Sequence, residues 1–127
     1  MYNFTERDSQ RLQEEKNIWL ASVNTKGNPH LVPLWFISRS NKIYMCTQSS
    51  SVKIRNLRNN NKVALSLENG HQAFICEGET KLLYKPFPKD VVSAFKAKYD
   101  WNIQESRSYD TLIEVFPQKV LKFNDDK

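Results

Sequence analysis

The sequence has little of several residue types that would narrow its function. Its 127 residues include three glycines and two cysteines, and the cysteines, Cys46 and Cys76, form no C-x-x-C pair. The two histidines, His30 and His71, are too few and too far apart for a metal cluster, so we expect no metal. No apolar run approaches the roughly 20 residues of a membrane span, and the charged N-terminus is unlike a secretory signal. These features predict a reduced, cytoplasmic protein that is not in a membrane.

Acidic residues are missing from a long stretch of the chain. Residues 17–67 contain no Asp or Glu, although the whole chain has fourteen of them and a net charge of +5. An asymmetry of this kind indicates an anionic partner for the basic half. Charge alone does not separate a phosphorylated small molecule from a nucleic acid. The cations of the stretch are Lys26, Arg39, Lys42, Lys53, Arg55, Arg58 and Lys62.

The length fits a single domain covering residues 1–127. Period-two alternation and short apolar runs predict strands, and amphipathic spacing predicts helices. The fold class is therefore α+β, mainly β: a barrel of six or seven short antiparallel strands with two or three short helices. The expected helices are residues 4–16, a basic helix between the serines at 49–51 and the asparagines at 59–61, and 89–99. The expected strands are residues 17–23, 30–38, 42–47, 62–67, 72–84, 111–116 and 119–123, with a turn at 38–41 and a frayed tail at 124–127.

Individual residues sharpen this prediction. The run at 30–38 is apolar on both of its faces, which is typical of a strand buried on both faces. Pro33 lies inside that run and has no N–H to donate, so it belongs at a sheet edge or a bulge. Gly78 predicts a bulge or a tight bend within its strand, and the asparagines at 59–61 predict a left-handed helix end.

The turn that leads into the basic helix is the first candidate site. Serines at 49–51 are favoured helix N-caps, and Lys53 then falls in the first turn, where the helix dipole already places positive charge. A bound anion would remove that conflict, since helix N-termini are ready-made phosphate sites. Arg55 and Arg58 follow, three residues apart and therefore neighbours on the helix surface. The alternative is a solvated basic helix with an ordinary serine cap.

A second candidate site follows from Pro33. At an edge or bulge, the backbone is not fully committed to a neighbouring strand, so a flat ligand can use the spare carbonyl and amide groups of four residues: Val32, Pro33, Leu34 and Trp35. The alternative is an edge proline that only discourages aggregation.

Taken in order, these motifs resemble the pyridoxamine phosphate oxidase-like flavin-binding proteins. The resemblance covers roughly residues 17–123. It is carried by Gly27, Pro29, Pro33, Trp35 and Phe36, then Thr47, then S-x-K-x-R-N-L at 51–57 and K-V-A-L-S-L at 62–67. It implies a split β-barrel that forms a homodimer with two flavin mononucleotide (FMN) sites at the interface. It also implies that the ring edge lies along residues 31–36 and that the phosphate and ribityl chain meet Thr47, Ser51 and Lys53.

The sequence departs from that family in two places. The oxidase proper carries an Arg-Lys pair after the serine, whereas this chain has Val52 and Lys53, so Arg55 or Arg58 would have to supply the second phosphate cation. The C-terminal substrate-binding segment of the oxidase has no match near Lys127. The chain therefore looks less like the vitamin-pathway oxidase and more like its small relatives, which bind FMN or a phosphorylated deazaflavin.

The resemblance implies a flavin-dependent oxidoreductase with a small-molecule redox substrate. The cofactor would supply the redox chemistry, and Trp35 or Trp101 would cover its ring, although both also suit a core or an interface. We identify no catalytic acid, base or nucleophile. Two other functions stay open: a deazaflavin-dependent reductase, or a flavin-binding sensor or store without turnover. A third, a barrel that stacks single-stranded nucleic acid on Trp35, Phe36 and Tyr44, is disfavoured because those aromatics lie in dense apolar runs.

Overall fold

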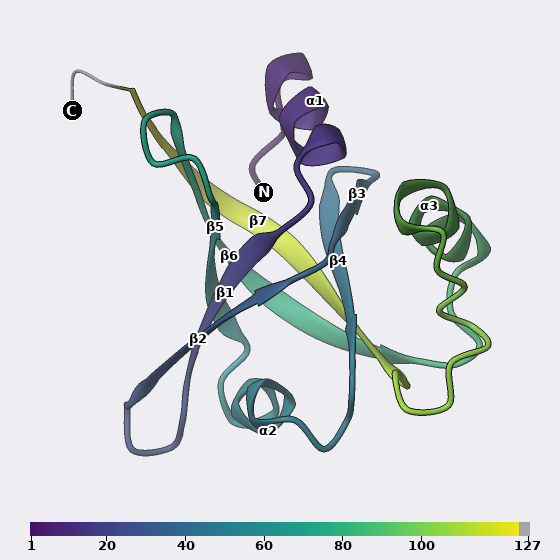
Figure 1. Cartoon of the computed structure of the whole chain (residues 1–127). Helices are drawn as coiled ribbons and strands as arrows, with labels where there is room; N and C mark the ends of the chain where they lie inside the picture. The colour runs from purple at the N-terminus through teal and green to yellow at the C-terminus, as the bar shows by residue number, and fades with distance from the viewer. Residues whose placement is uncertain (125–127) are drawn as a thin grey trace.

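The computed structural model describes residues 1–124 and contains one seven-stranded antiparallel sheet in the order β2-β1-β5-β6-β7-β4-β3. The sheet twists strongly, with α1 and α2 at opposite ends and α3 to one side (Figure 1). Seven strands and three helices confirm the predicted mainly-β class. Of the tail that we expected to be frayed, residues 125–127 lie outside the described part. The elements are α1 Glu6–Glu14, β1 Ile18–Val23, β2 Pro29–Leu34, β3 Ile37–Arg39, β4 Lys42–Thr47, α2 Val52–Asn59, β5 Lys62–Leu67, β6 Ala73–Tyr84, α3 Lys89–Tyr99 and β7 Thr111–Phe123.

Alternation along the strands builds the interior of the barrel. In β1 the side chains of Ile18 and Leu20 are buried, and in β5 those of Val63, Leu65 and Leu67 are buried. Each strand places every second residue on one face, so these apolar side chains meet on the concave side of the sheet. We call this group the barrel core; its other large, fully buried members include Leu12, Phe36, Ile43, Met45, Ile54, Phe74, Ile113 and Val115.

The prediction that residues 30–38 are buried on both faces is wrong. Strand β2 alternates exposed and half-buried residues, and Leu31 is 60% exposed. The reason is that α3 packs on β3, β4 and β7 instead, so in the described chain no helix covers the outer face of β2. The edge position of Pro33, which lies opposite Trp19, is as predicted. A long apolar run does not reveal whether its second face is covered by the same chain.

The turn expected at 38–41 is shorter than predicted. Ile37–Arg39 forms the short strand β3, which pairs with β4, and the turn itself is Ser40 and Asn41. Both turn residues have positive φ, 53° and 62°. Asparagine tolerates this left-handed region because its short polar side chain can bond locally, and the Asn41 amide oxygen accepts a hydrogen bond from the Phe4 N–H.

Strand β7 is continuous, whereas we predicted two strands separated at Pro117. Pro117 lies inside the strand opposite Gly78, and the register shifts between Glu77 and Gly78 because β7 has one residue more there, Gln118. The bulge predicted at Gly78 is therefore confirmed. A proline is accommodated because the ladder is already interrupted at a bulge. A Cβ atom at Gly78 would lie 2.6 Å from the Phe116 carbonyl oxygen, so the close approach of the two strands requires glycine.

Helix α1 closes one end of the barrel. Thr5 caps it through a reciprocal capping box with Asp8, and Leu12 is fully buried in the barrel core. Burial by itself would raise the pKa of Asp8, but hydrogen bonds from the Thr5 amide, Lys122 and Tyr2 hold that pKa below its usual value. Within residues 1–124, no helix has the length and apolarity needed to cross a membrane.

Helix α3 covers only part of the convex side of the sheet. It packs, together with Ile103, on side chains of β3, β4 and β7, where Phe95 and Leu112 are fully buried. The convex side of β2, β1 and β5 has no such cover in the described chain (Figure 1). We call this second region the open sheet face; its residues are Trp19, Ala21, Val23, Pro29, Leu31, Pro33, Ala64 and Ser66.

Candidate functional site

The start of α2 carries the features that the phosphate prediction requires. Lys53 is the second residue of the helix, its first turn contains no acidic residue, and the first amides of any helix lack intrahelical partners. Burial lowers the pKa of the Lys53 ammonium below its ordinary value of 10.5. In the part of the chain that the structure describes, no carboxylate forms an ion pair with it. A half-buried cation at the positive end of a helix dipole is unfavourable unless an anion joins it.

Ser51 occupies the N-cap position but does not cap the helix, which corrects the prediction. Its side chain makes no capping hydrogen bond, and its hydroxyl oxygen is buried without a hydrogen-bond partner among the described residues. An unsatisfied buried hydroxyl costs free energy, so this position also favours a ligand. The predicted left-handed helix end is wrong too: Asn60 is extended, with φ −145°, and its N–H closes the helix on the Asn56 carbonyl. The following strand requires an extended entry here.

The turn before α2 is held by the residue that precedes the neighbouring strand β7. The Asp110 carboxylate accepts hydrogen bonds from the Ser49 amide at 2.9 Å and from the Ser49 hydroxyl at 3.0 Å. These bonds lower the pKa of Asp110, so it remains ionised. Thr47, the last residue of β4, is buried and pairs with Thr111. The turn that leads into α2 is therefore fixed by β7, and sequence spacing gave no sign of Asp110.

Strand β2 and helix α2 meet at the same end of the barrel through β1. The Asn56 side chain of α2 donates a hydrogen bond to the Ser22 hydroxyl at 3.1 Å, and Ser22 lies opposite His30 of β2. The His30 Nδ1 atom is buried and has no hydrogen-bond partner in the described chain. The inward position of His30 could have been predicted only from the register of β2 against β1.

Trp35 and Trp101 come together although 66 positions separate them. Their ring centroids are 5.8 Å apart and nearly perpendicular, and Trp35 also stacks on Tyr99 at 4.5 Å and 9°. Trp101 in turn contacts Tyr109 edge-on at 5.2 Å. We call these four side chains, Trp35, Tyr99, Trp101 and Tyr109, the aromatic wall. Because Tyr109 precedes Asp110, the wall runs from the end of β2 to the turn before α2.

The other predicted site residues lie on two separate elements, β2 and α2. Val32 and Leu34 are half-buried on the concave side, where Leu34 packs against the barrel core. Val52 is 46% exposed and Arg55 is exposed on α2. The Arg55 N–H closes the first helical hydrogen bond on the Ser51 carbonyl at 3.2 Å, so its backbone is one turn from the serine. Among the described residues, no side-chain hydrogen bond or ion pair joins these four to one another.

The aromatic side chains of the nucleic-acid alternative are mostly inaccessible. Phe36 is fully buried, with the Lys98 ammonium 3.8 Å from its ring centroid, and Tyr44 is buried with its hydroxyl donating to Glu114 at 2.8 Å. Only Trp35, which is 48% exposed, retains a free face. A base-stacking platform needs several open rings in a row, and this strand arrangement does not provide them.

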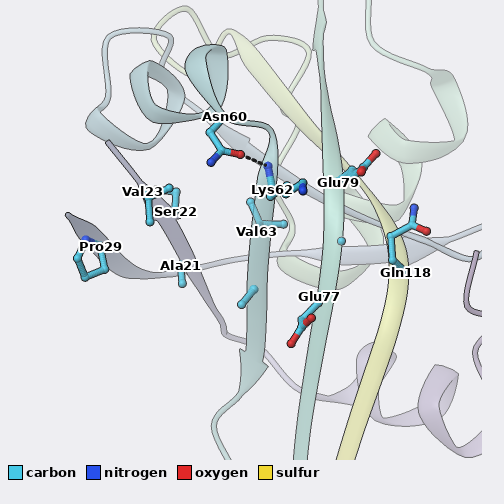
Figure 2. Close-up of a pocket in the computed structure, with 12 residues that line it drawn as sticks. Ala21, Ser22, Val23, Pro29, Asn60, Lys62, Val63, Glu77, Glu79 and Gln118 are labelled. Atoms are coloured by element: carbon cyan, nitrogen blue, oxygen red, sulfur yellow. Dashed lines mark hydrogen bonds between the residues drawn. The ribbon is translucent and has the colours of Figure 1, made fainter. Parts of the chain in front are cut away.

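A cavity of about 460 Å³ lies outside the predicted site, on the open sheet face (Figure 2). The small side chains of Ala21 and Ala64 line it, and Glu77, Glu79 and Lys62 also border it. Figure 2 shows Asn60 beside it, with its side-chain oxygen accepting a hydrogen bond from the Lys62 N–H. The cavity is a local hollow in this otherwise convex side of the sheet.

Comparison with solved structures gives many proteins of the same fold. The haem storage protein HutZ of Vibrio cholerae has a TM-score of 0.79 at 15% identity, covering 99% of this chain and 100% of that one. An F420 reductase has a TM-score of 0.76 at 18% identity, covering 93% and 98%. A FAD-binding protein of Mesorhizobium loti has a TM-score of 0.67 at 17% identity, covering 92% of each chain. At these identities the likeness shows the fold alone.

Comparison with sequence families is more specific. No curated protein matches the chain. The family model for pyridoxamine 5'-phosphate oxidase, however, matches residues 4–124, which is nearly the whole chain and includes the start of α2, strand β2 and the aromatic wall. The chain therefore belongs to the pyridoxamine 5'-phosphate oxidase family.

Proposed function

We propose that this chain binds FMN, with the FMN phosphate at the start of α2, and acts as a flavin-dependent oxidoreductase on a small molecule. The observation that carries the proposal is the start of α2, where a half-buried lysine, an unpartnered serine hydroxyl and free helix amides converge. Each of the three is unfavourable in isolation, and a phosphate dianion would satisfy all of them through charge-assisted hydrogen bonds.

The residues around this point have distinct roles in the proposal. Lys53 neutralises the phosphate, and the Ser51 hydroxyl donates a hydrogen bond to it. Arg55 supplies the second positive charge, which Val52 cannot provide. Asp110 acts indirectly, because its two hydrogen bonds to Ser49 hold the turn in place. The edge of β2, from Val32 to Trp35, offers backbone groups to the flavin ring, and bound flavin would supply the electron transfer.

FMN titration of the purified protein tests this function. We expect one FMN per chain, with riboflavin bound about 100-fold more weakly because it lacks the phosphate and its charge-assisted bonds. Flavin fluorescence and absorbance after desalting measure both affinities. A phosphorylated deazaflavin tested in parallel decides between the two cofactor classes, since the phosphate site would accept either. Equal affinities for FMN and riboflavin would show that α2 holds no phosphate.

We also propose that the protein is a homodimer joined through the open sheet face. This face exposes Leu31 and Pro33 beside Trp19 and Ala21, and contiguous apolar surface of this kind marks interaction sites. A second copy is the occupant that the family resemblance implies. The cavity over Ala21 and Ala64 would receive an apolar side chain from that copy.

Leu31→Asp is expected to convert the dimer into a monomer, because it buries an unpaired carboxylate at the interface. Light scattering coupled to size-exclusion chromatography measures the mass of each variant. Tyr84→Asp is the matched control, since Tyr84 is 54% exposed but lies at the α3 end of β6. A Leu31→Asp variant that elutes as the parent protein does would exclude this face as the interface.

A further inference from the structure

A cleft of about 630 Å³ lies between α1, β3 and α3, and no residue of the proposed FMN site lines it. Helices α1 and α3 lie on either side of β3, at the end of the barrel that α1 closes (Figure 1). Small-molecule sites have volumes of roughly 300–1,000 Å³, so this space can hold a metabolite. The open sheet face belongs to other strands, β1, β2 and β5, so the proposed dimer contact does not use the cleft.

The charged side chains that line this cleft are all positive. They are Lys16, Arg39 and Lys98, and no Asp or Glu of the described chain joins them. Burial, together with repulsion from Lys16, lowers the pKa of Lys98 to about 8. Glu15 opposes this shift only in part and is itself paired with Arg11. A cleft lined by cations alone concentrates anions, and a bound anion would relieve the repulsion between the two lysines.

Lys98 is held in position before any ligand arrives. Its ammonium donates hydrogen bonds to the Leu12 and Phe36 carbonyl oxygens at 2.9 and 3.0 Å. An ammonium group has three N–H donors, so one remains for a ligand. Within residues 1–124, no carboxylate forms an ion pair with Lys98 or with Lys16. A preorganised cation binds an anion without first losing side-chain freedom.

Uncharged donors complete the lining of the cleft. Arg39 bonds to Asp90 through Nε alone, at 3.1 Å, and its other guanidinium N–H groups make no hydrogen bond to the described residues. Four neutral polar side chains also make no hydrogen bond in this part of the chain, and hydroxyl and amide groups are suited to the oxygen atoms of a polar ligand. These side chains are Ser9, Gln13, Ser38 and Ser40.

From this arrangement we propose that the cleft is a second ligand site, which binds a compact organic dianion, either a phosphate ester or a dicarboxylate. The charged group of the ligand lies between Lys16, Arg39 and Lys98. Its polar body contacts Ser38 and Ser40. The class is a dianion because three cations line the cleft and only one of them, Arg39, has a carboxylate partner among the described residues.

An NMR titration of ¹⁵N-labelled protein with sodium phosphate, at ionic strength held constant with sodium chloride, tests the proposal. We expect saturable shifts of the backbone amides of Gln13, Ser38 and Ser40. The amides of Ser51 and Lys53 report separately on the start of α2, so binding at one site is not mistaken for binding at the other. Malonate, titrated in parallel, distinguishes a dicarboxylate site from a phosphate site.

Three variants locate the binding. Lys98→Met should weaken phosphate binding in the cleft at least about tenfold, because it removes a charge-assisted hydrogen bond. Lys16→Gln should weaken it about threefold, and it decides the matter if Lys98→Met does not fold, since Lys16 is exposed. Lys96→Gln is the matched control on α3 and should change nothing, because Lys96 pairs with Asp100 and does not line the cleft.

The outcomes separate this site from the proposed function. Saturable shifts that weaken in Lys98→Met and Lys16→Gln but persist in Lys96→Gln support the proposal, and the anion that saturates identifies the ligand class. Equal weakening in Lys96→Gln would overturn it, because the anion would then only screen surface charge. Shifts confined to Ser51 and Lys53 would overturn it too, while leaving the FMN phosphate site supported. Absence of saturable shifts in the cleft with both anions would likewise exclude the second site.

Discussion

Lys53→Glu should abolish the retention of FMN, lowering its affinity at least about 100-fold, while leaving the fold intact. The substitution removes a charge-assisted hydrogen bond worth roughly 1.5–3 kcal/mol and places a carboxylate against the phosphate. The apoprotein should tolerate the change, because a negative charge in the first turn suits the helix dipole better than the positive charge of lysine does. Flavin absorbance after desalting and the circular dichroism spectrum measure the two effects.

Arg58→Glu is the matched control for this variant. It makes the same charge change on the same helix, but in the last turn, where Arg58 is exposed and distant from Ser51. Its FMN affinity should fall only slightly, because the new carboxylate repels the phosphate only at long range. Lys53→Met removes the cation without adding an anion and should give an intermediate loss. A Lys53→Glu protein that retains as much flavin absorbance as the parent protein would contradict the placement of the phosphate at the start of α2.

The same lysine predicts a pH dependence. Burial lowers the pKa of Lys53, and only the protonated form attracts a phosphate. FMN affinity should therefore begin to fall, as pH rises, at a pH below the ordinary lysine value of 10.5. Lys53→Arg should remove this decline, because arginine remains charged throughout that range. An affinity that declines identically in both proteins would assign the titration to another group.

Gly78→Ala should destabilise the protein by about 3 kcal/mol, a large fraction of the stability of a domain of this size. The added Cβ would lie 2.6 Å from the Phe116 carbonyl oxygen and 3.0 Å from a methyl group of Val115. Backbone atoms cannot move aside cheaply, so the two longest strands would have to separate at the bulge. Urea denaturation followed by circular dichroism gives the free energy of unfolding.

Gly70→Ala provides the comparison, since a Cβ there meets nothing within 4 Å. Its effect should stay within about 0.5 kcal/mol, the usual range for open surface positions. Similar stabilities for the two variants would mean that β6 and β7 can separate at Gly78 without loss, contrary to the tight contact in the structure.

Local sequence signals predicted most of the fold. Alternation placed β4 and β5 at their observed bounds, and amphipathic spacing placed α3. The errors arose where a tertiary neighbour decides the outcome. Pro117 indicated a break between two strands, but the bulge opposite Gly78 accommodates it within one. The run around Leu31 indicated burial on both faces, but burial depends on a covering element that a local pattern cannot reveal.

The candidate site was predictable only where its residues are close in sequence. Ser51 and Lys53 share one helical turn, so capping rules and the dipole were enough to single them out. The predicted capping hydrogen bond is absent, because the Ser51 hydroxyl is buried and has no hydrogen-bond partner within residues 1–124. Asp110 and Tyr109 lie about 60 positions away and reach the site only through the pairing of β4 with β7. Contacts of that kind depend on which strands pair in the sheet, and the spacing of residues along the sequence does not reveal this.

The long antiparallel pairing of β6 with β7 has a consequence for how the protein unfolds. The same two strands supply Phe74 and Val115 to the barrel core and Leu112 to the cluster beneath α3. Neither cluster keeps its packing once these two strands separate. The protein should therefore melt in a single cooperative step, without a stable intermediate in which one half remains folded.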